Sequence, residues 1–107
     1  PQDVALIDAI KGINMFKKVG VPITGIIENM SYFICDECGK RHEIFSSGGV
    51  KKEALKFQTP FLGEIPINKN LRINSDKGLP VCIAEPEGTI SKIYLSIANK
   101  IDQNKLN

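Results

Sequence analysis

The sequence has no long apolar run and no strong charge of one sign. None of its apolar stretches approaches the roughly 18 to 20 residues that a membrane-spanning helix needs. Fourteen Lys and Arg against twelve Asp and Glu leave a formal net charge of +2, and the basic residues are scattered along the chain. We therefore expect neither a membrane anchor nor a nucleic-acid-binding surface.

Cysteine is scarce, and its count is odd. The three cysteines are Cys35, Cys38 and Cys82, and the first two form one CxxC. An exported protein stabilised by disulfides more often has an even number of cysteines. We therefore favour a reducing compartment in which the thiols bind a metal or take part in redox chemistry. The chain begins with Pro1 rather than Met and shows no signal-peptide pattern. These features predict a soluble intracellular protein and a chain cut from something longer.

A phosphate-binding P-loop is also missing. Residues 47–52 carry two glycines and two lysines ahead of a predicted helix. A P-loop has the pattern G-x-x-x-x-G-K-[ST], with a glycine directly before the lysine and a hydroxyl after it. Here Val50 precedes Lys51, and Lys52 follows it. We interpret the stretch as a glycine-rich helix start, with weak anion binding at the helix N-terminus as the alternative.

The residues that are present describe one domain or a piece of one. Apolar residues make up 42% and charged residues 24% of the 107 residues, as in an ordinary folded protein. Helical spacing of apolar residues predicts an amphipathic helix over residues 3–19 and a closing helix near the C-terminus. The apolar stripe of the closing helix consists of Ile90, Ile93, Tyr94, Ile97 and Ile101. Short β-branched segments predict strands at residues 21–27, before a polar stretch, and 61–65, before Pro66.

A short helix is predicted between the two strands, at residues 50–57. The order strand, excursion, helix, strand is a βαβ unit, which joins parallel neighbours. Residues 68–77 are expected to hold a turn of helix, and residues 80–84 an apolar segment in which Cys82 is a small buried hydrophobe. Two or three parallel strands leave an unpaired edge, so partner strands are expected from an N-terminal part or from another copy.

The CxxC is the strongest local signal for chemistry. Residues 32–45 predict a loop or short hairpin with the two cysteines at its tip. Two thiolates three positions apart supply half of a four-ligand metal site. Three interpretations are open: two chains pair their cysteines around a [4Fe-4S] cluster or zinc, His42 joins them as a third ligand with water or Cys82, or the pair is a redox dithiol. For His42 we favour a surface or hairpin-packing role over a ligand role.

Asn29 and Pro66 are candidates for a nucleotide pocket. Asn29 stands at the predicted carboxyl end of the first strand, where ligands bind in open α/β sheets. Its amide offers the donor and the acceptor that complement adenine N7 and N6. Pro66 ends the second predicted strand at the same edge and would wall a base pocket. Taken alone, Asn29 also fits a role in capping a turn.

Several segments together resemble the C-terminal half of the Mrp/ApbC family. They are residues 1–6 (PQDVAL), 25–33 (GIIENMSYF), 35–39 (CDECG), 48–49 (GG), 61–66 (FLGEIP) and 75–80 (SDKGLP). The family comprises iron-sulfur cluster carrier ATPases with a deviant Walker A P-loop, related to MinD and ParA. The resemblance implies a three-layer α/β/α P-loop NTPase-like fold with mostly parallel strands. It makes residues 1–107 the C-terminal part of a single ATPase domain whose phosphate loop lies N-terminal to the match.

The same resemblance implies a function and a set of site residues. Cys35 and Cys38 of two subunits would bridge a [4Fe-4S] cluster across a homodimer, which then passes to apo-proteins. Asn29 and the segment around Pro66 would form the adenine pocket, with ATP and Mg2+ bound by the full-length protein. ATP hydrolysis is expected of that protein and not of this chain alone, and the resemblance implies a cytoplasmic location. The alternatives are a zinc-binding interaction module and a MinD-like partition ATPase without a cluster.

Overall fold

The computed structural model describes residues 3–45 and 49–105. In chain order the elements are α1 (Asp3–Lys18), β1 (Ile26–Ile34), β2 (Arg41–His42), α2 (Gly49–Lys56), β3 (Phe61–Ile67), α3 (Lys69–Asp76), α4 (Val81–Ala84) and α5 (Thr89–Lys105). Within the described ranges, no helix combines the length and the apolar character that crossing a membrane requires. The predicted glycine-rich helix start falls partly on residues 46–48, which lie outside the described residues.

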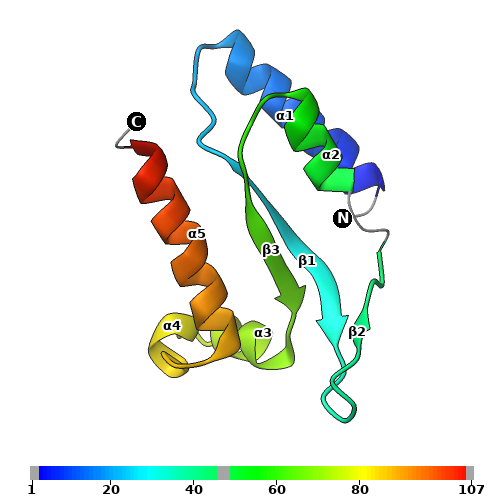
Figure 1. The fold of residues 1–107 in the computed structure, drawn as a ribbon, viewed down its shortest axis with the longest axis vertical. Coiled ribbons are helices and arrows are strands. Elements are labelled where there is room, and N and C mark those ends of the chain that lie inside the picture. Colours follow the sequence, from blue (N-terminus) through cyan, green and yellow to red (C-terminus); the bar gives the residue numbers. More distant parts are fainter. Residues whose placement is uncertain (1–2, 46–48, 106–107) are drawn as a thin grey trace.

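The three strands form one sheet in the order β2-β1-β3. β1 and β3 run parallel, whereas β2 is antiparallel to β1. The parallel pair with α2 between its strands is the βαβ unit that the sequence predicts. In Figure 1 the sheet runs between α5, α3 and α4 on one side and α1 and α2 on the other. This layered α/β arrangement with a parallel strand pair confirms the predicted fold class.

α5 packs on β3, and the two elements supply the core. Leu62, Ile65 and Ile97 are buried, and Leu71, Ile93 and Ile101 pack against them. Gly63 lets the helix come close, because a β-carbon at this position would lie 3.1 Å from Cγ1 of Ile97. Lys100 adds a hydrogen bond, its Nζ donating to the carbonyl of Leu62 at 2.9 Å. The predicted stripe of the closing helix therefore faces the sheet, with Tyr94 at its exposed margin.

β1 begins and ends later than the sequence predicts. It starts at Ile26, after a segment that contains Pro22, which has no amide hydrogen to donate. It continues to Ile34 through Glu28 and Ser31, whose polarity predicts an end instead. Both polar side chains are buried, and Ser31 Oγ donates to Glu28 Oε2 at 2.7 Å. A hydrogen bond between the two side chains thus allows the strand to bury them.

β3 also runs beyond its predicted end. It passes through Pro66 to Ile67, and its pairing with β1 moves from Ile65 opposite Asn29 to Ile67 opposite Phe33 across an irregularity. A proline fits at such an irregularity because the regular ladder is interrupted there. After β3, α3 is a helix of eight residues, more than the single predicted turn. Asn68 stabilises its start, the side-chain oxygen accepting from the amide of Leu71 at 2.9 Å.

Residues 80–84 include the short helix α4. Val81 is buried, whereas Cys82 is exposed and Ile83 is 69% exposed. The prediction that Cys82 is a small buried hydrophobe is therefore wrong. One helical turn buries only one side of an apolar run, and Cys82 lies on the other side.

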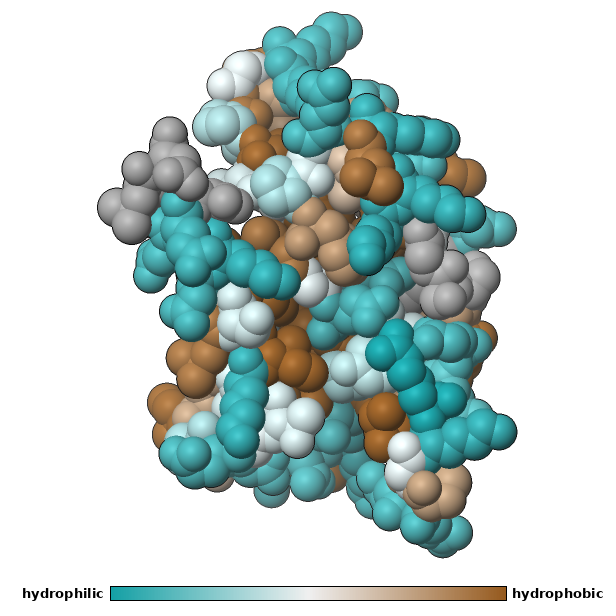
Figure 2. Space-filling view, viewed as in Figure 1, coloured by the Kyte–Doolittle hydropathy of each residue, from teal (hydrophilic) through white to brown (hydrophobic). Residues whose placement is uncertain are grey.

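α1 confirms the predicted amphipathic helix but buries none of its side chains fully. Leu6, Ile10 and Ile13 are half-buried. Val4 is 73% exposed and Val19, after the helix, is 67% exposed. Figure 2 shows apolar side chains, in brown, reaching the surface in several places between hydrophilic ones. The described residues thus leave apolar surface uncovered on this helix.

Candidate functional site

The two cysteines of the CxxC lie in a tight turn at the tip of a β-hairpin, as the sequence predicts. β1 and β2 form the arms and pair through Phe33 with His42 and Ile34 with Arg41. Beyond them, the amide of Cys35 donates to the carbonyl of Lys40 at 3.0 Å, and the amide of Gly39 donates back to the carbonyl of Cys35 at 2.8 Å. Gly39 has φ of 70°, a left-handed conformation that glycine adopts without strain. Figure 1 shows this turn projecting beyond the rest of the molecule.

The turn lowers the pKa of Cys35 below that of an ordinary thiol. The backbone amides of Cys38 and Glu37 and the thiol of Cys38 lower the pKa of Cys35, because they stabilise the thiolate by hydrogen bonding. Partial burial and the nearby charge of Asp36 act in the opposite direction and are outweighed. Cys38 is exposed, and Cys35 is half-buried. The turn therefore favours the thiolate, which is the form of cysteine that binds metals.

Neither of the other two candidate ligands supplies a third ligand in this chain. Among the described residues, no group of three or more His, Cys, Asp or Glu side chains is placed to hold a metal ion. His42 is exposed on β2, and its ring lies 6.4 Å from that of Phe33 at a tilt of 38°, which fits the predicted hairpin-packing role. Cys82 lies on α4. In the described part of the chain, the CxxC therefore offers two ligands.

Asn29 lies within β1, not at its end. It is the fourth of nine residues, because the strand continues to Ile34. Its side chain is exposed, and Oδ1 accepts from the amide of Met30 at 2.9 Å. Met30 has φ of 55°, which bends the strand at this point. Asn29 contributes to a cavity of about 170 Å³ that α1 and α2 cover with mainly apolar side chains.

Pro66 borders a different cavity, of about 380 Å³. This cavity lies where β1 and β3 end, and Tyr32, Asp36 and Asn68 are among the residues that border it. The structure therefore places Asn29 and Pro66 on two cavities instead of one shared pocket. The cavity at Pro66 also contacts the hairpin arm that leads into the CxxC, so a ligand bound there would touch that arm.

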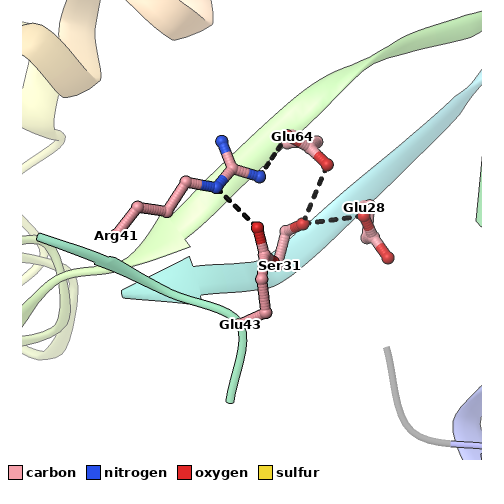
Figure 3. Close-up of polar contacts among 5 residues, drawn as sticks. All are labelled: Glu28, Ser31, Arg41, Glu43 and Glu64. Atoms are coloured by element: carbon pink, nitrogen blue, oxygen red, sulfur yellow. Dashed lines mark hydrogen bonds and ion pairs between the residues drawn. The ribbon is translucent and has the colours of Figure 1, made fainter. Parts of the chain in front are cut away.

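A polar network that the sequence analysis missed connects the hairpin with the sheet (Figure 3). Ser31 Oγ lies 2.7 Å from Glu28 Oε2 and 3.2 Å from Glu64 Oε1. Arg41 donates from Nη2 to Glu64 Oε2 at 3.1 Å and from Nε to Glu43 Oε1 at 2.7 Å. These bonds to Glu43 and Glu64 raise the pKa of Arg41. The signal in the sequence is weak: two glutamates and a serine lie inside strands that are mostly apolar.

Comparison with known proteins identifies the class to which this fold belongs. The family model described as ParA, NUBPL iron-transfer P-loop NTPase, matches residues 1–102. A solved structure, a nucleotide-binding protein from Archaeoglobus fulgidus in complex with ADP, superposes with a TM-score of 0.60 at 36% sequence identity. The superposition covers 75% of this chain and 32% of that chain. The α/β fold is thus that of the P-loop NTPases.

The chain belongs to the ParA/NUBPL iron-transfer P-loop NTPase family. It is 50% identical over 101 residues to the iron-sulfur cluster carrier protein of Escherichia coli (strain K12), covering 94% of this chain and 27% of the relative. It is 46% identical over 101 residues to the iron-sulfur cluster transfer protein NUBPL of Dictyostelium discoideum, covering 94% of this chain and 31% of that relative. The chain therefore spans less than a third of the length of these relatives.

Proposed function

We propose that this chain is the cluster-holding part of an iron-sulfur cluster carrier. Two copies each contribute Cys35 and Cys38, and the four thiolates hold one [4Fe-4S] cluster as cargo between the subunits before its transfer to apo-proteins. The CxxC turn at the tip of the hairpin carries this proposal. It supplies two thiols, and the described residues bring no third ligand to them. The relatives are named as carrier and transfer proteins, which supports the role.

The donor set fits a cluster that must be both bound and released. Thiolates are the usual ligands of iron-sulfur clusters, and the lowered pKa of Cys35 favours the thiolate. Cys38 is exposed, so a thiol of a recipient protein can reach the iron that it binds and exchange with it. Thiolates must stay reduced for this chemistry, and a cytoplasmic location is therefore part of the proposal.

In this proposal, a longer protein that contains this chain binds the nucleotide. We infer that residues 1–107 form the C-terminal part of a single ATPase domain, which binds and hydrolyses ATP with Mg2+ when the phosphate loop is present. The sequence contains no G-x-x-x-x-G-K-[ST] pattern, and it spans less than a third of its relatives. The ADP complex of the structural neighbour supports nucleotide binding. Asn29 and Pro66 are proposed to contact the base, which requires that their two cavities be joined.

Anaerobic reconstitution of the chain with iron and sulfide tests the cluster. We expect a brown protein with broad visible absorption, whose mass in solution is that of a dimer. Cys35→Ser and Cys38→Ser should each lose both the colour and the dimer. Cys82→Ser is the matched control, because this exposed cysteine lies on α4 outside the hairpin. This variant should take up the cluster as the parent chain does.

Three results would contradict the proposal. A colourless monomer that retains zinc would indicate a zinc-binding interaction module instead. Loss of the cluster in Cys82→Ser with retention in Cys35→Ser would show that the hairpin does not hold it. For the full-length protein, an ATPase activity that drives partition and survives the Cys35→Ser, Cys38→Ser double change would favour a MinD-like protein without a cluster.

A further inference from the structure

The return arm of the CxxC hairpin has few contacts with the rest of the molecule. β2 consists of two residues, Arg41 and His42, and pairs only with the last part of β1. No ladder joins β2 to β3, since β1 lies between them in the sheet. The direction in which the CxxC turn projects therefore depends on what holds this short arm.

Arg41 is the residue that holds the arm to the far strand. Its guanidinium carbon lies 3.8 Å from the centre of the Tyr32 ring in β1. From there Nη2 reaches Glu64 Oε2 in β3 at 3.1 Å. Among the side-chain hydrogen bonds of the described residues, the one from Arg41 to Glu64 links the return arm to another strand, whereas the one from Arg41 to Glu43 stays within the arm. Figure 3 shows the guanidinium between Glu43 and Glu64.

Glu64 needs this cation because Ser31 cannot satisfy both carboxylates. A serine hydroxyl has a single proton to donate. Ser31 Oγ lies 2.7 Å from Glu28 Oε2 but 3.2 Å from Glu64 Oε1, so the shorter bond to Glu28 takes the proton. Glu28 is only 3% exposed, and its Oε1 has no hydrogen-bond partner among the described residues. Without Arg41, two carboxylates would face each other across Ser31 with no positive charge beside them.

We propose that Arg41 is a positioning residue for the CxxC turn: by neutralising Glu64 it holds the return arm against the sheet. In doing so it sets the direction in which Cys35 and Cys38 face a second copy of the chain. The second statement rests on the proposed function, whereas the first concerns the hairpin alone. Arg41 contacts neither cysteine among the contacts described, so it acts through the arm that carries Cys38.

Hydrogen exchange of the hairpin amides tests the first statement without any cluster. Arg41→Ala should speed exchange of the amides of Cys35 and Gly39 roughly two- to fivefold, the effect of losing an exposed ion pair. Arg41→Lys, which keeps the positive charge, should exchange these amides at nearly the rate of the parent chain. The matched control is Arg72→Ala, which removes an exposed arginine paired with Asp76 in α3, far along the chain from the hairpin. Circular dichroism checks that each variant is folded.

The double variant Arg41→Ala, Glu64→Gln separates neutralisation from simple loss of contact. If Arg41 acts by neutralising Glu64, the added change removes the uncompensated charge and returns exchange toward the parent rate. Equal exchange in Arg41→Ala and the parent chain would overturn the proposal. So would a double variant that exchanges as fast as Arg41→Ala. If Arg41→Ala does not fold, Arg41→Lys against Arg41→Gln gives the same comparison.

The rate of iron loss to a chelator tests the second statement. In the reconstituted chain, Arg41→Ala should lose iron several-fold faster than the parent, and the double variant should regain part of the lifetime. If the parent chain takes up no cluster but the exchange results hold, the proposed function fails while the role of Arg41 in the hairpin stands. If the parent chain takes up the cluster and Arg41→Ala keeps its iron equally long, only the role of Arg41 in holding the cluster is refuted. The proposed function then stands.

Discussion

Cys35 shares one turn with Cys38, and the groups of this turn determine its pKa. The backbone amides of Cys38 and Glu37 point toward Cys35 and lower its pKa. Cys82 is exposed on a different element. The acidity of Cys35 therefore comes from the conformation of four residues around one turn and not from burial or from a basic neighbour.

Alkylation of the metal-free chain measures this lowering of the pKa. Because the pKa of Cys35 is lowered, its thiolate persists to lower pH than an ordinary thiolate does. The pH midpoint of its reaction with iodoacetamide should therefore lie below that of the same cysteine in the urea-unfolded chain, which is the control. Pulse labelling across a pH series, followed by peptide mass spectrometry, gives the midpoint in each state. Coincident midpoints would show that the amides of the turn do not stabilise the thiolate.

Two glycines, Gly25 and Gly12, differ in the space that the neighbouring elements leave for a side chain. Gly25 precedes β1, and a β-carbon there would clash with Cγ of Leu62, a buried core residue. Gly12 lies within α1, and nothing comes within 4 Å of the position of its β-carbon. The same substitution at the two sites should therefore have opposite effects on stability.

Gly25→Ala should lower the free energy of unfolding by about 1 to 3 kcal/mol, the usual cost of overfilling a packed site. Gly12→Ala should raise it by up to about 1 kcal/mol, because alanine is the better helix former. Urea denaturation followed by circular dichroism measures both, with each variant serving as the control for the other. A loss of stability in Gly12→Ala would mean that α1 is packed more closely at this position than the structure shows.

At the scale of the whole molecule, two features concern the surface: the separate cavities at Asn29 and Pro66, and the exposed apolar side chains of α1. Asn29 and Pro66 border separate cavities, and α1 leaves apolar side chains exposed. Both features are expected if the chain is, as proposed, the C-terminal part of a larger ATPase domain against which α1 packs. Within the described residues, the sheet has three strands and β3 lies at its edge.

Nucleotide affinity should therefore depend on the rest of the protein. The charged phosphates carry much of the affinity for ATP and need backbone donors and Mg2+, which a P-loop provides. Titration calorimetry of this chain with ATP and Mg2+ should show only feeble binding, and the full-length protein should bind clearly. Tight binding by the chain alone would contradict this expectation and would show that the cavity at Pro66 is sufficient.

The sequence by itself determined the local structure and the family. Helical periodicity located α1 and α5, and the CxxC with Gly39 located the hairpin tip, because these patterns act through neighbouring residues in the chain. The motifs around Cys35 and Asn29 indicated the family, to which the chain belongs. The predicted ends of β1 and β3 were wrong, because polar residues and Pro66 end a strand only when no partner accommodates them.

Only the tertiary structure decided how distant residues are combined. Arg41 and Glu64 are 23 positions apart, and no periodicity links them, yet their pairing connects the hairpin with β3. The same holds for Cys82, whose exposure depends on how one short helix is oriented. The structure likewise places Asn29 and Pro66 on two separate cavities. Burial and ion pairing are properties of residues brought together in space, and a linear pattern does not specify which ones meet.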